Sequence, residues 1–157
     1  MTCRVVILLG AVATALLAQK YEGPRPAKPD IPYIKHADSL LATEVSEATE
    51  EKRKDDILYV VPGAESTVKT PLASPILLFQ SDKIVPDTLQ LFKLETRNGR
   101  REILFSHKKR QTAKPIRIDI TRLGPDLYQV EVTSSLDKGE YSLSPDGSNR
   151  VFCFQVY

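Results

Sequence analysis

The sequence has only two cysteines and no tryptophan. Cys3 lies at the N-terminus, in a segment that we expect to be removed on export, so Cys153 would be the only thiol of the mature chain. A single cysteine can form no internal disulfide. Small exported domains often gain about 2–4 kcal/mol from each disulfide. This protein must therefore be stabilised by burial of apolar surface.

Histidine is equally scarce, and the familiar catalytic motifs are missing. His36 and His107 are the only histidines, whereas a zinc site needs three or four converging ligands. The sequence has no Gly-x-Ser-x-Gly motif, no phosphate-binding glycine loop and no His-Glu-x-x-His motif. Because catalysis requires matched groups in one pocket, we expect no enzyme, no cofactor and no metal site.

Neither sign of charge dominates. The 157 residues include 22 Lys and Arg against 20 Asp and Glu, which gives a formal net charge of +2. No global field would attract nucleic acid, so nucleic acid is not an expected partner. The length suits one domain with a tail.

The N-terminus is typical of a secretory signal peptide. Arg4 supplies a positive charge, and the fourteen residues from Val5 to Ala18 are apolar or small. We expect residues 1–18 to be the signal peptide, cleaved between Ala15 and Ala18, and the mature protein to be secreted or periplasmic. A membrane anchor is the alternative, but this run is short against the roughly 20 residues that span a bilayer.

Two segments precede the main domain. Residues 19–36 are predicted to be a Pro-rich linker, because their four prolines favour extended backbone and exclude a helix. Residues 37–56 are highly charged and have two interpretations. Leu41, Val45 and Ala48 have helical spacing, whereas the β-branched residues in the same stretch favour a strand. A short helix is slightly favoured over a strand.

Residues 57–157 carry short β-prone runs separated by turn residues. Ile116, Ile118 and Ile120, for example, alternate with polar residues, as on a strand with one buried face. Seven or eight such runs predict an all-β domain, an antiparallel β-sandwich.

The clearest element is a β-hairpin with its turn at Asn98-Gly99, the residue pair that a type I′ turn prefers. The turn predicts that Arg97 pairs with Arg100 and Glu95 with Glu102. Four apolar side chains then share one face, which we expect to point into the sandwich core. They are Phe92, Leu94, Ile103 and Phe105.

The stretch Asp137-Lys138-Gly139-Glu140-Tyr141 resembles the tyrosine corner of immunoglobulin-like domains. The resemblance implies that the Tyr141 hydroxyl folds back on the preceding loop and that the last two strands follow. Leu143 stands where that family has a disulfide cysteine. The C-terminal sequence also resembles the end of small secreted bacterial proteins of unassigned function.

Two surfaces are candidates for binding. The first is the basic loop His107–Lys114, which could bind an anionic glycan or lipid head group through Lys108, Lys109, Arg110 and Lys114. The second is an apolar outward face, covered either by the N-terminal segment or by a partner. Its predicted members are Leu91, Leu104, Val151, Cys153 and Tyr157. The favoured function is a secreted structural or protein-interaction module, with another envelope or extracellular protein as partner; the anionic ligand is the alternative.

Overall fold

The computed structural model describes residues 20–157, so the predicted signal peptide lies outside the described residues. The described chain forms thirteen strands and one 3-10 helix, η1 (Pro86–Thr88). The strands are β1 (Pro32–His36), β2 (Ser39–Ala42), β3 (Glu44–Glu47), β4 (Thr49–Arg53), β5 (Asp56–Pro62), β6 (Lys69–Thr70), β7 (Ile76–Gln80), β8 (Leu89–Arg97), β9 (Arg100–Phe105), β10 (Ile118–Arg122), β11 (Leu127–Val132), β12 (Gly139–Pro145) and β13 (Arg150–Val156).

The strands form two sheets that pack as a sandwich. The five-stranded sheet has the order β10-β11-β7-β1-β2, and the eight-stranded sheet has the order β3-β13-β12-β8-β9-β5-β4, with β6 added beside β13. Every pairing is antiparallel except that of β6 with β13. The predicted all-β sandwich is therefore confirmed, with more strands than the seven or eight expected.

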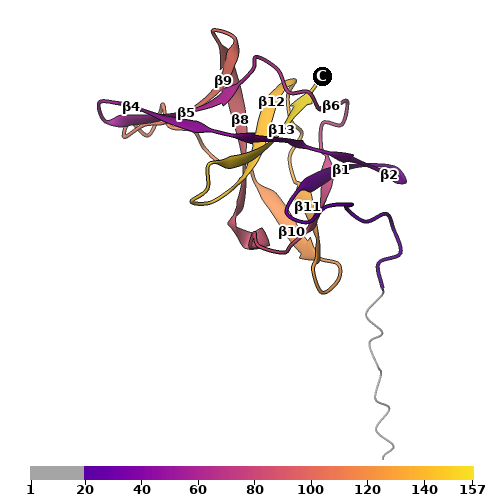
Figure 1. Cartoon of the computed structure of the whole chain (residues 1–157). Helices are drawn as coiled ribbons and strands as arrows, with labels where there is room; N and C mark the ends of the chain where they lie inside the picture. The colour runs from indigo at the N-terminus through magenta and orange to yellow at the C-terminus, as the bar shows by residue number, and fades with distance from the viewer. Residues whose placement is uncertain (1–19) are drawn as a thin grey trace, which may run out of the picture.

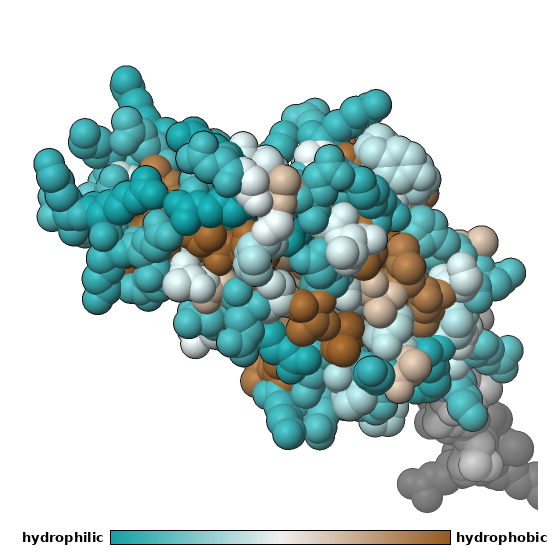
Figure 2. Space-filling model, turned by 45° about the horizontal axis from the view of Figure 1, so that its top comes forward, coloured by the Kyte–Doolittle hydropathy of each residue, from teal (hydrophilic) through white to brown (hydrophobic). Residues whose placement is uncertain are grey.

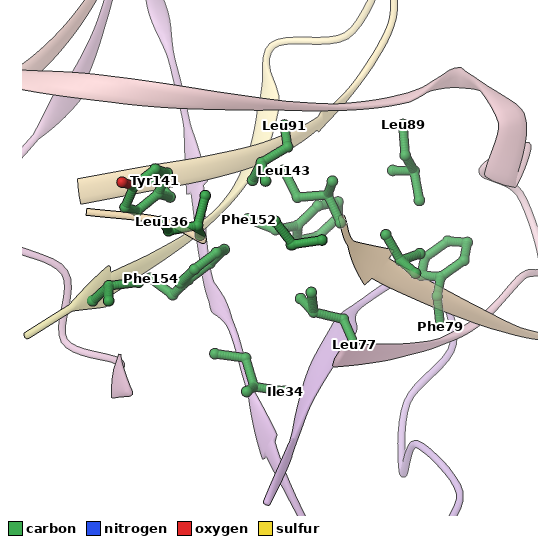
Figure 3. Close-up of a cluster of buried hydrophobic side chains, with 13 residues drawn as sticks. Ile34, Leu77, Phe79, Leu89, Leu91, Leu136, Tyr141, Leu143, Phe152 and Phe154 are labelled. Carbon is green, nitrogen blue, oxygen red and sulfur yellow. The ribbon is translucent and has the colours of Figure 1, made fainter. Parts of the chain in front are cut away.

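The main core lies between the two sheets. Ile34, Leu77 and Phe79 of the five-stranded sheet point toward Leu143 and Phe152 of the larger sheet (Figure 3). All five side chains are fully buried. Burying one large apolar side chain contributes about 1.5–3 kcal/mol, so this contact between the layers replaces the missing disulfide as the source of stability.

Residues 37–56 are strand, and the favoured helix is wrong. Strands β2, β3 and β4 follow one another with only Thr43 and Ala48 between them, and together they cross the molecule as one extended ribbon (Figure 1). β2 pairs with β1, β3 with β13, and β4 with β5. Backbone pairing on three different strands outweighs the helical spacing of a few apolar side chains.

The ribbon also curls the larger sheet. β3 and β4 are the two edges of that sheet, yet they are separated in sequence by Ala48 alone. The Ala48 amide donates a hydrogen bond to the Asn149 carbonyl at 2.8 Å, so contact with the β12–β13 connection continues past the end of β3. The sheet must bend until its edges meet, and the bend encloses its outer face.

The predicted hairpin turn is present. Asn98 and Gly99 have φ values of 52° and 76°, and Arg97 pairs with Arg100 and Glu95 with Glu102. Beyond Glu95 the two strands diverge, because β8 pairs with β12 from Leu94 back to Leu89 while β9 pairs with β5.

The predicted orientation of the hairpin is wrong. Leu89 and Leu91 are the β8 residues that enter the sandwich core. Successive side chains of a strand point to opposite faces, so Phe92 and Leu94 point to the concave outer face. Both remain buried there. Leu94 belongs to a second apolar cluster, and the Phe92 ring packs against Phe105.

The Tyr141 hydroxyl donates a hydrogen bond to the Asp137 carbonyl at 2.7 Å, which is the contact predicted for this stretch. Tyr141 is buried and its ring stacks on Phe154. The contact is local, and the likeness to immunoglobulin-like domains stays a prediction.

The end of the predicted linker belongs to the domain. Residues 32–36 form β1, an inner strand of the five-stranded sheet, so the sandwich begins well before residue 57. Asp30 precedes it in a left-handed conformation, with a φ of 57°, and its carboxylate accepts hydrogen bonds from the backbone N–H groups of residues 82, 83 and 84. Burial alone would raise the pKa of Asp30, but these three donors and Arg150 together hold the pKa below its ordinary value.

We predict that Asp30→Asn lowers the free energy of unfolding by about 1–3 kcal/mol at neutral pH, because a buried charge-assisted network loses its acceptor. A group with a depressed folded pKa stabilises the fold above its unfolded pKa, and that contribution is lost as the pH falls through the folded pKa. The difference between wild type and variant should therefore shrink in acid. Urea unfolding at neutral and acidic pH measures it, with the exposed Asp38→Asn as control.

Candidate functional site

The curled sheet encloses a pocket of about 330 Å³ on its concave face. Six strands contribute inward side chains, and the β12–β13 connection closes one side. The lining residues are Ala48, Glu50, Tyr59, Val61, Gln90, Phe92, Leu94, Ile103, Phe105, Ser142, Ser144, Val151 and the segment 145–149. The volume lies at the lower end of the range for small-molecule sites.

Aromatic rings form one wall of the pocket. Phe105 packs edge-to-face against Phe92 and against Tyr59, with ring centroids 5.5 Å and 5.7 Å apart. These rings come from β5, β8 and β9, so three strands together build this wall. Packed rings of this kind form a stiff apolar surface that suits a hydrocarbon group.

Polar groups make up nearly half of the pocket lining, and some of them are already hydrogen-bonded to one another. The Ser142 and Ser144 hydroxyls share a hydrogen bond of 2.7 Å, and the Tyr59 hydroxyl donates to Glu50 at 3.4 Å. Burial, together with the Glu50 carboxylate, raises the pKa of Tyr59. No nucleophile in this lining is paired with a histidine base, and the arrangement is suited to binding.

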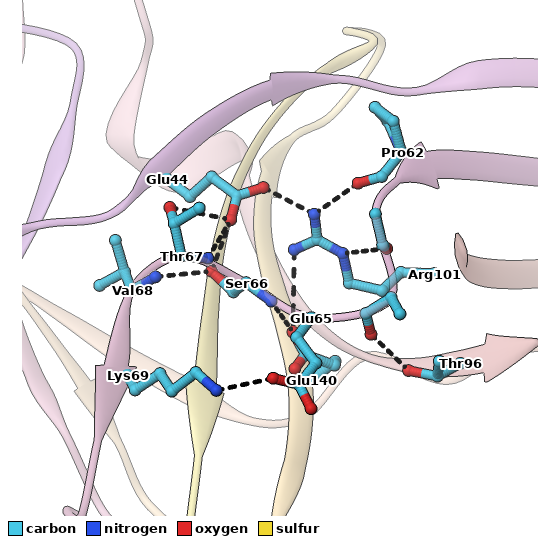
Figure 4. Close-up of polar contacts among 12 residues, drawn as sticks. Glu44, Pro62, Glu65, Ser66, Thr67, Val68, Lys69, Thr96, Arg101 and Glu140 are labelled. Atoms are coloured by element: carbon cyan, nitrogen blue, oxygen red, sulfur yellow. Dashed lines mark hydrogen bonds and ion pairs between the residues drawn. The ribbon is translucent and has the colours of Figure 1, made fainter. Parts of the chain in front are cut away.

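The other end of the curled sheet is closed by Arg101 (Figure 4). The side chain is 1% exposed, and its guanidinium donates hydrogen bonds to Glu44 at 2.6 Å and to the Pro62 and Gly63 carbonyls at 2.7 Å and 3.1 Å. Glu140 lies 3.7 Å from the same guanidinium. One arginine thus joins β3, β9, β12 and the end of β5.

The two glutamates differ in their electrostatics. Burial would raise the pKa of Glu44, but hydrogen bonds from Arg101, the Thr67 amide and the Ser66 hydroxyl lower it below the ordinary value. Burial dominates for Glu140 and raises its pKa, although the Ser66 amide and Arg101 oppose the shift. Glu44, more than Glu140, is therefore the counter-ion of Arg101.

We predict that Arg101→Met lowers the free energy of unfolding by about 3–5 kcal/mol, because it leaves buried carboxylate uncompensated. The matched control is Arg97→Met on the same hairpin. Arg97 pairs with Glu95 at the exposed tip, so its loss should cost less than about 1 kcal/mol. Equal losses in chemical denaturation would contradict a structural role for the Arg101 cluster.

Cys153 lies between the closed end and the pocket. The thiol is fully buried in the second apolar cluster with Val61, Leu94 and Val151. Burial, with smaller effects of neighbouring charges, raises the pKa of the thiol to about 12. The reactive thiolate is therefore disfavoured.

We predict that Cys153 reacts slowly with a thiol reagent in native buffer and completely in denaturant, and that the protein forms no disulfide-linked dimer. The reason is that both access and ionisation are blocked in the folded chain. Labelling followed by mass spectrometry measures this. Rapid native labelling, or a reducible dimer on a gel, would show that the outer face of β13 is open.

The four predicted basic residues are exposed in the loop between β9 and β10. In residues 20–157, none of the side chains of Lys108, Lys109, Arg110 and Lys114 forms an ion pair. The loop begins directly after Phe105, which the structure places in the pocket wall.

The predicted apolar interaction face does not exist as one surface. Leu91 lies in the sandwich core, whereas Val151 and Cys153 lie in the second cluster on the other side of the sheet. Leu104 is half-buried, and Tyr157 alone is exposed. On the face shown in Figure 2, apolar side chains form separate small patches among hydrophilic ones, as is normal for a protein surface.

The pocket itself was missed because its members come from six strands. The available signal was that both faces of the hairpin and of the last strand carry apolar residues. A strand with one solvent-exposed face needs apolar residues on the other face only. The additional apolar residues predicted a covered face, but no local pattern indicates that the same sheet would cover it.

The chain matches no protein-family model, and no significant match was found to a curated protein or to a solved structure. Over residues 20–157, no helix has the length and apolar character needed to cross a membrane. In the same range, no group of three or more potential ligands from His, Cys, Asp and Glu is placed to hold a metal ion.

Proposed function

We propose that the protein is a secreted, non-enzymatic binding module and that the pocket of the curled sheet is its binding site. The observation that carries the proposal is the aromatic wall of Phe92, Phe105 and Tyr59 around a cavity of about 330 Å³. Such a cavity favours the apolar part of a ligand, because burial of hydrocarbon contributes about 25 cal/mol per Å².

The surroundings of the pocket support a fixed site. The Arg101 cluster closes the opposite end of the curled sheet, and the hydrogen-bonded ribbon of β3 and β4 holds the edges together. A site on paired strands loses little conformational freedom when a ligand binds. Export and an envelope or extracellular partner remain parts of this proposal, supported by the N-terminal sequence.

The test is binding of the neutral fluorescent probe N-phenyl-1-naphthylamine to the folded protein. We expect saturable binding with one site per chain. Ser144→Leu adds volume to the lining and should weaken binding at least tenfold, which corresponds to about 1.4 kcal/mol. The matched control is Ser135→Leu, at an exposed position outside the pocket, which should leave the affinity unchanged.

A second pocket variant keeps the test decisive if Ser144→Leu does not fold. Gln90 also lines the pocket but is exposed, so Gln90→Phe should narrow the cavity without loss of stability. Unfolding curves establish that each variant is folded. Absence of saturable binding, or equal binding by pocket and control variants, would overturn the proposal.

A further inference from the structure

The basic loop begins directly after the aromatic wall of the pocket. Phe105 forms part of the wall, and the next residue, Ser106, donates a hydrogen bond from its hydroxyl to Asp56 at 2.6 Å. The Ser106 amide donates to the Thr112 hydroxyl at 3.1 Å, and the Gln111 amide to the Lys108 carbonyl at 2.8 Å. The loop thus starts and returns beside the β4–β5 hairpin, as its ribbon also shows (Figure 1).

The charges of this loop differ from those of the neighbouring hairpin. Arg97 pairs with Glu95, Arg100 with Glu51 and Glu102, and Arg101 with Glu44. In contrast, Lys108, Lys109 and Arg110 lie exposed and form no ion pair within residues 20–157. Three adjacent cations without counter-ions favour an anion next to them.

The acidic groups of the pocket do not cancel this preference. Glu50 accepts a hydrogen bond from Tyr59 and lies 3.9 Å from the Lys52 ammonium. Asp146 is exposed in the β12–β13 connection and belongs to a different part of the lining. At the end of β9 the Asp56 carboxylate accepts a hydrogen bond from the Ser106 hydroxyl, and the three exposed cations that follow outnumber it. An anionic group would therefore be directed toward these cations and away from Asp146.

We infer that the ligand is a single-chain anionic amphiphile, namely a free fatty acid. Its hydrocarbon chain would lie against Phe92, Phe105 and Tyr59, and its carboxylate would lie at the rim beside the basic loop. This inference rests on the proposed function and adds the chemical class of the ligand. The apolar wall ends at Phe105, and the loop with the unpaired cations Lys108, Lys109 and Arg110 begins at the next residue, so the two parts of such a molecule would separate there.

The experiment compares dodecanoate with dodecanol as competitors of bound N-phenyl-1-naphthylamine in full-length mature protein. We expect dodecanoate to displace the probe at a concentration at least tenfold lower than dodecanol does, and the difference to shrink at high salt. The triple variant Lys108→Gln, Lys109→Gln and Arg110→Gln should abolish the preference for dodecanoate. The concentration of dodecanol that displaces the probe should stay unchanged.

A triple variant with the same change of charge is the control. Lys28, Lys83 and Lys138 are exposed and lie outside the loop and the pocket lining. Their replacement by glutamine should retain the preference for dodecanoate. If both triple variants lose it equally, the attraction comes from the overall charge and the inference is wrong.

The remaining outcomes separate this inference from the proposed function. Failure of the probe to bind would overturn both, whereas equal displacement by dodecanoate and dodecanol would overturn this inference alone. Sedimentation with phosphatidylglycerol vesicles tests a membrane as the anionic partner. Vesicle binding that needs the loop cations and is unaffected by Ser144→Leu would assign the loop to a bilayer surface and overturn the fatty-acid site.

Discussion

The fold depends on the extended ribbon from Ser39 to Arg53. Its backbone pairs with β1 in one sheet and with β13 and β5 in the other, so its hydrogen bonds connect the two layers and also both edges of the larger sheet. An isolated sheet edge exposes unpaired N–H and C=O groups. Here β3 and β4, the two edge strands, are consecutive in the chain. Because the short connection keeps them close together, the sheet has to bend.

The bend explains why one strand serves two apolar clusters. β8 directs Leu89 and Leu91 to the sandwich core and Phe92 and Leu94 to the concave face. β13 does the same with Phe152 on one side and Cys153 on the other. A flat sheet would expose one of these faces to water. The curled sheet covers most of the second face with its own strands, and the part that remains uncovered is the pocket.

Local patterns predicted the strands after residue 57 and the Asn98-Gly99 turn, because period-2 alternation and positive φ are properties of short segments. They did not predict β1 to β4. Polar residues dominate 37–56. These strands form because they pair with strands distant in sequence, and the β-propensity of a single segment does not predict such pairing. The predicted orientation of the hairpin was wrong for the same reason. Alternation shows that Phe92 and Leu94 share a face, but the curl of the sheet decides which apolar cluster that face packs against.

The two ends of the curled sheet are made of opposite chemistry. At one end Arg101 satisfies Glu44 and two backbone carbonyls, and removal of any member would leave a buried group without a partner. At the other end an aromatic and aliphatic wall faces polar residues of the same pocket, and the apolar wall carries no comparable penalty when the pocket is empty. The charged end must therefore stay closed, whereas the apolar end can be vacated and refilled. In the proposed function a ligand would enter from the pocket side, where Glu50 and Asp146 are part of the lining and the basic loop begins directly after Phe105 of the wall.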